Sequence, residues 1–440
     1  MLPTASLSRR AALKCLAASL AGPFVFRRHA VAAPSETVYH ASIGASGQAL
    51  SDIKSLISHK HFQLVAVADV DLERTAEVKK LVPDVKVYQD WRELLDKEKN
   101  LTSVNVSTPD HMHASITMRA MQQGLHVYTQ KPLTQTIHEA RQLTKTARDR
   151  KLVSQMGIQI HGHPVHRTVV AAIQAGAIGK VKEVHSWSGK KWGDKGTRPD
   201  RKDAVPEKLN WDQWLGVAAE RPFLANYYHP GQWRKRLDFG TGTFGDMGCH
   251  ILDPVYGSLA LTAPKSLHSE GGSPNADNWG LDSKVRYVFP GTKYTTDTLT
   301  LVWYDGDQRP PDEVKKLLGD AKLNDQGSIY LGTEGVLYSP YIAAPVLYAD
   351  GKVRDYRWPK PGGENHYHQF VDAVRGIGKT AAPFDYSGPL TEMVLLGCLA
   401  TRFPKTTLEW DAKALKVTNV EEANQYVRRK YRKGWEVEGL

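Results

Sequence analysis

An aspartate and a histidine that lie four residues apart, Asp246 and His250, have the types and spacing of a reactive pair. They follow the run Gly240-Thr241-Gly242, and if a helix begins there, both side chains lie on one of its faces. Histidine titrates near neutral pH and can take the proton of a hydroxyl group, while the carboxylate can bind a neighbouring hydroxyl. The structural alternative is a helix cap and a hydrogen-bonded histidine of the core.

A glycine-containing turn follows the first strand-like segment, in the run Gly44-Ala45-Ser46-Gly47-Gln48-Ala49. Turns that bind dinucleotides use glycines because the backbone must turn tightly and approach a pyrophosphate, whose charge is met by a helix amino terminus. Ser46 replaces the usual middle glycine. Asp69 ends the next strand-like segment, where a carboxylate can accept hydrogen bonds from an adenosine ribose, which favours NAD over NADP. The alternative is an ordinary glycine turn and a surface aspartate. We expect cofactor contacts here at Gly44, Ser46, Gly47, Gln48 and Asp69.

Lys131 stands between an apolar strand-like segment and a proline, in the run Thr129-Gln130-Lys131-Pro132-Leu133. A residue before proline is held in extended geometry, so the amine can be aimed at a substrate hydroxyl beside the nicotinamide ring. The preceding strand-like segment runs into Thr108, Pro109 and His113. Both loops should leave the sheet on the side of the nicotinamide. A salt-bridged loop lysine is the alternative for Lys131.

Short β-branched segments alternate with helical segments from Val38 to about Met156. The expected strands are residues 39–43, 63–68, 85–88, 103–107, 126–128 and 153–156. The expected helices are residues 49–58, 73–81, 91–97, 114–123 and 136–150. This alternation predicts a parallel sheet covered on both faces, which binds its ligands at the carboxyl ends of the strands.

After Met156 the pattern changes to long polar connections and alternating strand-like runs. These runs are residues 181–188, 284–289, 298–303 and 327–331, and residues 364–403 have a helical pattern. Such a pattern is typical of an antiparallel sheet with a few helices. We therefore predict an α/β Rossmann-type domain at residues 34–155 and an α+β domain with a mostly antiparallel sheet at residues 156–440.

Taken together, the motifs resemble the Gfo/Idh/MocA family, the relatives of glucose–fructose oxidoreductase and inositol dehydrogenase. The resemblance extends from about residue 38 to beyond residue 400. It rests on Thr108-Pro109 with His113, Gln130-Lys131-Pro132, Gln155-Met156-Gly157-Ile158-Gln159 and Gly245-Asp246-Met247-Gly248-Cys249-His250. It implies a nucleotide-binding domain joined to an α+β substrate domain, and oxidation or reduction of a sugar or polyol carbon with NAD(P).

The resemblance also implies roles for individual residues. Lys131, Asp246 and His250 match the catalytic lysine, aspartate and histidine of the family: the lysine would hold and polarise the substrate oxygen, and the histidine would take its proton. Gln130 and Gln159 join Thr108, Pro109, His113 and Lys131 as expected cofactor contacts. The usual Glu-Lys-Pro is Gln-Lys-Pro here, which removes an acidic neighbour from Lys131, although the amide can still orient the lysine.

Five tryptophans of the predicted second domain precede the Asp246 segment, and indole rings can stack on the apolar faces of sugars. We choose Trp192 and Trp233 as substrate contacts and expect most of the others in the core. Five histidines are expected to line the nicotinamide cleft: His111, His113, His161, His163 and His166. A metal site is the alternative for them, but no acidic ligand or strict helical pairing supports one.

Residues 1–33 have the order of a cleavable export signal, with Arg9 and Arg10, an apolar stretch from Cys15 to Phe26, and the run Ala30-Val31-Ala32-Ala33. The apolar stretch is too short to span a bilayer. The paired arginines resemble a twin-arginine signal, which would export the folded protein to the periplasm. An ordinary secretory leader or an uncleaved tail is the alternative. Cys249 and Cys398 lie in apolar runs and are expected as buried free thiols.

Export would constrain the chemistry, because no pool of dinucleotide replenishes an enzyme outside the cytoplasm. A retained cofactor must return to its starting state, either by oxidising one sugar and reducing another or by transient oxidation of a glycoside, elimination, hydration and re-reduction. The second route is an NAD-dependent glycoside hydrolase that does without the usual two carboxylates. A sugar-binding protein without catalysis is a third hypothesis, which the presence of Lys131, Asp246 and His250 disfavours.

The net charge of +11 includes five basic residues and no acid in residues 1–32, so 11 − 5 leaves +6 for the rest of the chain. A basic stretch near the carboxyl end is expected to be a solvated tail: Arg428, Arg429, Lys430, Arg432 and Lys433. No groove-reading motif accompanies it, so nucleic-acid binding is not expected. The expected partners are a carbohydrate or glycoside, no membrane, and a second copy of the chain, since the open sheet face of the second domain often assembles in the family.

Overall fold

The computed structural model describes residues 36–440. The predicted export signal at residues 1–33, with Arg9, Arg10 and Cys15, lies outside the described residues. The first sheet consists of β1 (Val38–Ile43), β2 (Phe62–Ala68), β3 (Lys86–Tyr88), β4 (Ser103–Val106), β5 (His126–Gln130) and β6 (Ser154–Gly157). All its neighbouring strands pair in parallel, in the order β3-β2-β1-β4-β5-β6. This order reverses direction between β1 and β4, which is where Rossmann-type sheets bind dinucleotides.

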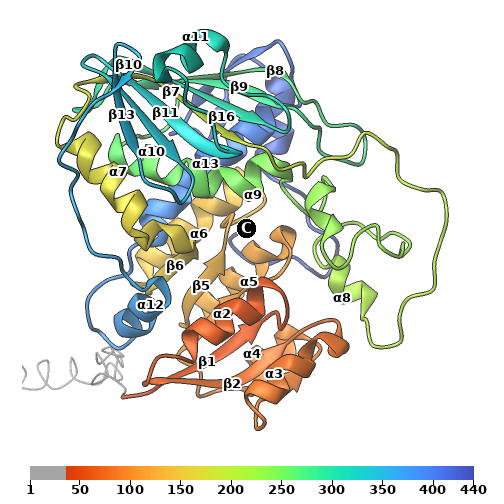
Figure 1. The fold of residues 1–440 in the computed structure, drawn as a ribbon. Helices are drawn as coiled ribbons and strands as arrows, with labels where there is room; N and C mark the ends of the chain where they lie inside the picture. Colours follow the sequence, from red (N-terminus) through yellow and green to blue (C-terminus); the bar gives the residue numbers. More distant parts are fainter. Residues whose placement is uncertain (1–35) are drawn as a thin grey trace, which may run out of the picture. The chain divides into compact units, whose positions relative to one another are not determined.

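Helices connect these strands and cover the sheet (Figure 1). They are α2 (Gln48–Leu56), α3 (Ala76–Leu81), α4 (Trp91–Lys97), α5 (Asp110–Gln122) and α6 (Ile137–Asp149). The start of α6 shows how the sequence sets a boundary: Glu139 N donates to Thr136 Oγ1, and Thr136 N donates to Glu139 Oε2. The central strand β4 is buried on both faces, as expected of a parallel sheet between helices, whereas the edge strand β3 is partly exposed.

The second sheet has the mostly antiparallel pairing that the sequence predicts. Its order is β14-β13-β12-β11-β7-β10-β9-β8-β15-β16, with β7 and β10 paired in parallel and the other neighbours antiparallel. The strands are β7 (Val181–Ser188), β8 (Ser266–Gly271), β9 (Lys284–Pro290), β10 (Thr295–Asp305), β11 (Gln326–Gly332), β12 (Val336–Pro340), β13 (Val346–Ala349), β14 (Lys352–Val353), β15 (Thr407–Asp411) and β16 (Lys416–Val417). The predicted fold class is therefore confirmed.

Helices cover both faces of the second sheet (Figure 1). On the face toward the first sheet lie α7 (Pro164–Gln174), α9 (Gly242–Ile251), α10 (Asp253–Ser258) and α13 (Phe384–Ala400). One core runs from Val104 of the first sheet through Phe244 and Val394 to Leu301 of the second, so α9 is held between the sheets. On the opposite face, α11 (Asp312–Lys315) packs with Val314 over Trp187 and Tyr304. That face is thus partly covered, and the expected homo-oligomer stays a prediction.

The segment predicted as helical at residues 364–403 contains two helices rather than one. These are α12 (His366–Val374) and α13, separated by residues 375–383. The helix α12 returns to the first sheet, where Phe370 and Val371 pack with Val38, Leu56 and Tyr128. A simple division of the chain at one residue therefore does not separate the packing of the two sheets, and the predicted boundary near residue 155 stays a prediction.

The basic carboxyl-terminal stretch is not the solvated tail that its composition predicts. Arg432 Nε donates to Gly216 O at 2.9 Å, and its Nη1 donates to Asp212 Oδ1 at 2.6 Å. Tyr431 donates to Glu139 on α6, and the Trp435 ring packs 4.3 Å from the guanidinium carbon of Arg92 on α4. Charge alone predicts a free tail, whereas Tyr431 and Trp435 anchor the stretch to α6 and α4, and Arg432 anchors it to residues 212–216.

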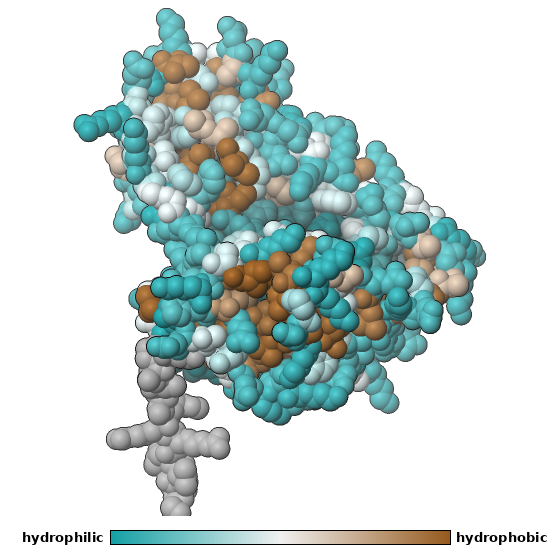
Figure 2. Space-filling model, turned by 60° about the horizontal axis from the view of Figure 1, so that its bottom comes forward, coloured by the Kyte–Doolittle hydropathy of each residue, from teal (hydrophilic) through white to brown (hydrophobic). Residues whose placement is uncertain are grey.

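The face shown in Figure 2 is mostly hydrophilic, with several hydrophobic patches. No helix in residues 36–440 has the length and apolar composition needed to cross a membrane. Cys249 and Cys398 are buried and free, as predicted.

Candidate active site

One cavity of about 620 Å³ is lined by the predicted catalytic residues, cofactor contacts and substrate tryptophans. It receives the carboxyl ends of β1, β2, β4 and β5 from the first sheet and the side chains of α9 from the second domain. The predicted residues that line it are Gly44, Ser46, Gly47, Gln48, Asp69, Thr108, Pro109, His113, Gln130, Lys131, Gln159, Trp192, Trp233, Asp246 and His250.

The glycine turn between β1 and α2 leaves room for a dinucleotide. Gly44 has φ +108°, and a Cβ there would stand 2.6 Å from the carbonyl oxygen of Ser107, so this position requires glycine. At Gly47, with φ +59°, a Cβ would meet nothing within 4 Å, so the backbone borders open space. No side chain caps the amino end of α2. The uncapped helix end and the open backbone fit a bound pyrophosphate.

Asp69 stands at the end of β2 and faces the glycine turn. We call Gly44, Ser46, Gly47, Gln48 and Asp69 together the dinucleotide cradle. Its Oδ2 accepts from Ala45 N at 3.0 Å and its Oδ1 accepts from Asp71 N at 3.0 Å. Burial raises the pKa of Asp69 to about 6, against the opposing effect of these two hydrogen bonds, so the group is mostly ionised at neutral pH. Each carboxylate oxygen retains acceptor capacity for a ribose hydroxyl.

A segment of the second domain, of which the sequence predicts only Trp233 in the site, crosses the adenosine end of this cradle. We call residues 208–239 the strap. Asn210 N donates to Val70 O at 2.8 Å, and Leu72 N donates to Lys208 O at 3.1 Å, directly after Asp69. A small aromatic core holds the strap together: Leu209, Trp214, Leu215, Ala218, Phe223, Leu224, Tyr227, Tyr228, Trp233 and Phe239.

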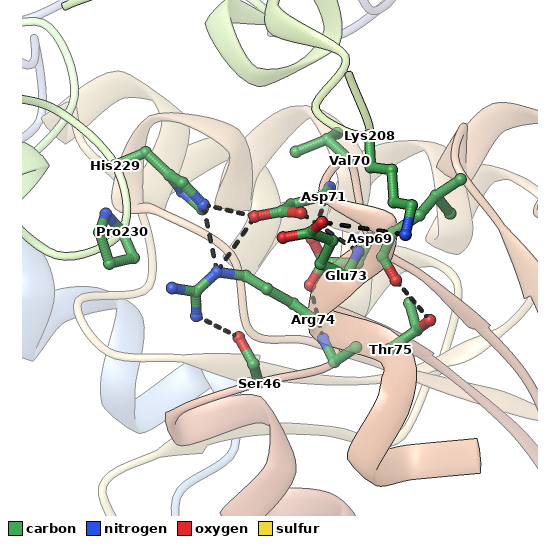
Figure 3. Close-up of polar contacts among 12 residues, drawn as sticks. Ser46, Asp69, Val70, Asp71, Glu73, Arg74, Thr75, Lys208, His229 and Pro230 are labelled. Atoms are coloured by element: carbon green, nitrogen blue, oxygen red, sulfur yellow. Dashed lines mark hydrogen bonds and ion pairs between the residues drawn. The ribbon is translucent and has the colours of Figure 1, made fainter. Parts of the chain in front are cut away.

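Polar side chains also connect the strap to the cradle (Figure 3). His229 Nε2 lies 2.9 Å from Asp71 Oδ2 and 3.1 Å from Arg74 Nε, and Arg74 Nη1 donates to Ser46 Oγ at 2.8 Å. Ser46 in the glycine turn is thus linked to the strap through Arg74. Arg74 and His229 line the cavity, and neither has a local sequence signal, because their partners are remote in the chain.

Lys131 and Asp246 meet at the opposite end of the site, next to α9. Lys131 Nζ donates to Asp246 Oδ1 at 2.7 Å and to the Asp246 carbonyl at 2.8 Å. The two side chains are only 14% and 9% exposed, so little water screens the pair. Burial alone would raise the pKa of Asp246, but Lys131, Arg234 and Lys190 hold it well below its usual range. Asp246 is therefore ionised and fixes the lysine amine in the cavity.

His250 lies one helical turn beyond Asp246, as the four-residue spacing predicts, and lines the same cavity. Burial, assisted by the charge of Lys131, lowers the pKa of His250 to about 3. The ring is therefore neutral at physiological pH and can accept a proton. Its Nδ1 is buried without a hydrogen-bond partner among the described residues.

Gln130 contacts the backbone of Lys131 and not its amine. Its Nε2 donates to both oxygens of Asp52 on α2, at 3.1 and 2.9 Å, and its Oε1 accepts only the backbone N–H of Lys131, at 3.3 Å. Asp52 is buried and also accepts from Gln48, Ser107 and Tyr367. A buried carboxylate on α2 thus bonds the amide, while Asp246 positions the lysine.

Of the five histidines expected in the cleft, only His113 lines the cavity, and its ring lies 2.8 Å from Pro132 O and 2.9 Å from Thr108 O. His161 instead pairs with Asp253 at 2.9 Å, and His111 bonds the carbonyl of Trp214. His163 caps α7 and His166 is buried, away from the cavity lining. Among residues 36–440 no group of three His, Cys, Asp or Glu side chains could hold a metal ion.

Comparison with known proteins gives matches along nearly the whole described chain. Residues 40–158 match the oxidoreductase family model GFO_IDH_MocA, an NAD-binding Rossmann fold, and residues 159–437 match the C-terminal alpha/beta domain of the oxidoreductase family. Levoglucosan dehydrogenase of Pseudarthrobacter phenanthrenivorans is 22% identical over 187 residues, which are 42% of this chain and 40% of that protein. The scyllo-inositol 2-dehydrogenase (NADP(+)) of Bacillus subtilis is 25% identical over 190 residues, 42% of each chain. The matches thus span under half the length of these relatives.

Solved structures share the fold at low sequence identity. The WlbA dehydrogenase from Bordetella pertussis, in complex with NADH and UDP-GlcNAcA, has a TM-score of 0.61 and 14% identity, covering 85% of this chain and 99% of that chain. GenD2 from gentamicin A biosynthesis, in complex with NAD, has a TM-score of 0.59 and 18% identity, covering 86% and 98%. The first domain is accordingly an NAD-binding Rossmann domain.

Proposed function

This chain belongs to the Gfo/Idh/MocA oxidoreductase family, and from that premise we propose that it oxidises or reduces a secondary hydroxyl carbon of a carbohydrate with NAD(P). One observation carries the proposal: Lys131, Asp246 and neutral His250 line the same cavity as the dinucleotide cradle. The dehydrogenases among the matched relatives act on sugars and an inositol by name, which supports a polyhydroxylated substrate.

A bound nicotinamide supplies the acceptor or donor of the hydride. The substrate hydroxyl lies between Lys131 and His250, where the amine stabilises negative charge that develops on oxygen and the imidazole takes the hydroxyl proton. In the reverse direction the imidazolium returns that proton to the carbonyl oxygen. Asp246 holds the amine at 2.7 Å, so the lysine side chain keeps its place in the cavity. Trp233 and Arg234 of the strap also line this cavity.

The choice of dinucleotide is proposed to depend on Asp69. We expect Asp69→Asn to weaken NAD binding about tenfold, because a hydrogen bond from a ribose hydroxyl to a charged acceptor contributes ~1.5–3 kcal/mol. NADP binding should be affected less or should improve, since the 2′-phosphate no longer faces a carboxylate. The measurement is the ratio of the two dissociation constants. General damage to the turn would weaken both dinucleotides equally and would contradict this role for Asp69.

The strap supports a further part of the proposal, that the cofactor is retained through purification. Unfolding the purified protein should release a stoichiometric amount of dinucleotide, measured by chromatography of the protein-free supernatant. His229→Ala removes the contacts to Asp71 and Arg74, and should speed dinucleotide dissociation about tenfold. The matched control is His268→Ala, at a half-buried histidine of β8 that bonds Thr407, outside the cavity lining. Protein that purifies empty and exchanges NAD within seconds would refute retention.

A redox-neutral glycoside hydrolase is the second candidate. Asp110 favours it, because this carboxyl lines the cavity and burial raises its pKa to about 7, so it can give a proton to a leaving oxygen near neutral pH. Incubation with nitrophenyl glycosides and no added NAD distinguishes the two: steady nitrophenol release indicates hydrolysis, and none indicates oxidoreduction.

Export through a twin-arginine signal, to the periplasm, is also part of the proposal. The paired Arg9 and Arg10 support it, and a retained cofactor is compatible with export of the folded protein. Replacing both arginines by lysine should keep the protein inside the cell, as read from cell fractionation.

A further inference from the structure

Three cationic side chains converge on the carboxylate of Asp246. Lys131 Nζ lies 2.7 Å from Oδ1, Arg234 Nε lies 3.4 Å from the same oxygen, and Lys190 Nζ lies 3.5 Å from Oδ2. Three positive charges against one negative charge leave an excess of two. Asp110 is the other acid near these cations, and because burial raises its pKa to about 7, it is mostly protonated below that pH and leaves the excess in place.

Arg234 lines the cavity beside two indole rings. Its guanidinium carbon lies 4.3 Å from the ring centroid of Trp233 and 5.4 Å from that of Trp192. Nε faces Asp246, whereas Nη1 and Nη2 make no hydrogen bond within residues 36–440. The two indoles that the sequence suggests as sugar contacts therefore flank a guanidinium. A planar guanidinium held in this way can donate hydrogen bonds to two oxygens of one anion, such as a carboxylate.

Lys190 comes from a loop that is anchored to the helix carrying Asp246. The loop follows β7, and Trp192 N donates to Thr243 Oγ1 in the first turn of α9 at 2.7 Å. Thr243 Oγ1 in turn donates to the Lys190 carbonyl at 3.3 Å. The Lys190 side chain is 45% exposed, yet its backbone is fixed. A second cation thus stands beside Arg234.

The dinucleotide turn has a cation of its own, since Arg74 donates to Ser46. Lys190 and Arg234 instead surround the carboxylate that positions Lys131. An oxidised nicotinamide ring is itself positively charged, so a bound cofactor increases the positive excess at this end of the cavity. A neutral sugar would leave that excess unbalanced, whereas an acidic one would offset it.

We propose that the substrate carries a carboxylate, and that this end of the cavity selects sugar acids over neutral sugars through Arg234 and Lys190. Arg234 binds the carboxylate with Nη1 and Nη2, and Lys190 contributes a further charge. The inference rests on the proposed function, because it places the acid next to the hydroxyl held by Lys131.

The test measures binding by calorimetric titration of protein loaded with NADH, which cannot accept a hydride, so that affinity is read without turnover. The probes are glucuronate, galacturonate and gluconate, each with its methyl ester or parent neutral sugar, and the corresponding sugar phosphates. We expect at least one acid to bind more than tenfold tighter than its uncharged counterpart, with an affinity that falls as salt rises. If no acid is preferred, or if only the phosphates are, the proposal is wrong.

Single-residue variants test which side chains cause the preference for acids over uncharged sugars. Arg234→Gln should weaken acid binding by ~10–100-fold and leave the uncharged counterpart unaffected. Lys190→Gln, at a half-exposed position that folding tolerates, should weaken acid binding several-fold. Lys191→Gln is the matched control, because that neighbouring lysine pairs with Asp307 and does not line the cavity. Equal weakening of NADH by the Arg234 and Lys190 variants would overturn the subsite and assign both cations to the cofactor. Failure of wild-type protein to bind NADH would refute the proposed function instead.

Discussion

Replacing Lys131 by methionine is expected to lower kcat by about 10²–10³-fold, the effect of removing one donor to a developing oxyanion. The amine is the group that Asp246 holds at 2.7 Å in the cavity, and methionine keeps the length of the side chain without its charge. Asp246 retains Arg234 and Lys190 as partners, so the fold should survive. The measurement is the initial rate of NADH formation with the preferred substrate.

Two controls separate chemistry from structure in this variant. Bound dinucleotide and the thermal unfolding midpoint should match those of the wild type, and Lys145→Met, at an exposed lysine paired with Asp149, should be fully active. A Lys131→Met protein with a near-normal rate would show that the substrate oxygen is stabilised elsewhere.

His250→Asn should lower kcat by about 10²–10⁴-fold, the range for a lost general base. The pH dependence gives a sharper test. Burial and Lys131 lower the pKa of His250 to about 3, so the neutral base is present above that pH and lost only as pH falls through it. Oxidation should therefore show no acid limb from His250 between pH 8 and pH 5. A wild-type limb near pH 6.5 that vanishes in His250→Asn would contradict this assignment.

The same shift has a consequence for stability with a definite sign. Above pH 6.5, the unfolded-state pKa, the His250 imidazole is uncharged in both the folded and the unfolded state. In that range it adds no pH dependence to the free energy of unfolding. Below pH 6.5 the unfolded chain binds a proton that native His250 refuses, so the wild type loses stability as pH falls toward 3. His250→Asn should lose less of its unfolding midpoint between pH 7.5 and pH 5 than the wild type.

Local periodicity predicts the parts of the site whose partners are close in sequence. The four-residue spacing of Asp246 and His250 requires only a helix, and the turn at Gly44 and Gly47 requires only a strand followed by a helix. The parallel sheet can likewise be predicted from the alternation of strand-like and helical segments, because each segment has an apolar pattern of its own. These features could be predicted because short-range geometry determines them.

Contacts between distant segments could not be predicted in this way. Arg234 and Lys190 are ordinary charged residues in loops until folding brings both within 3.5 Å of Asp246. Asp52 gave no signal, because an acid in a helix is usually solvated, whereas here it is buried and bonded by Gln130. Short strands such as β12 and β15 depend on the two neighbouring strands with which each one pairs. No local pattern encodes those partners.

The anchored carboxyl-terminal stretch bears on how the protein is made. Tyr431, Arg432 and Trp435 brace α6, the loop after α8 (Trp211–Leu215) and α4, all of which are synthesised hundreds of codons earlier. A nascent chain can build the first sheet as it emerges, but the cradle and strap gain these supports only after residue 435 leaves the ribosome. We expect a chain interrupted before this stretch to lose the cofactor sooner than it loses its secondary structure.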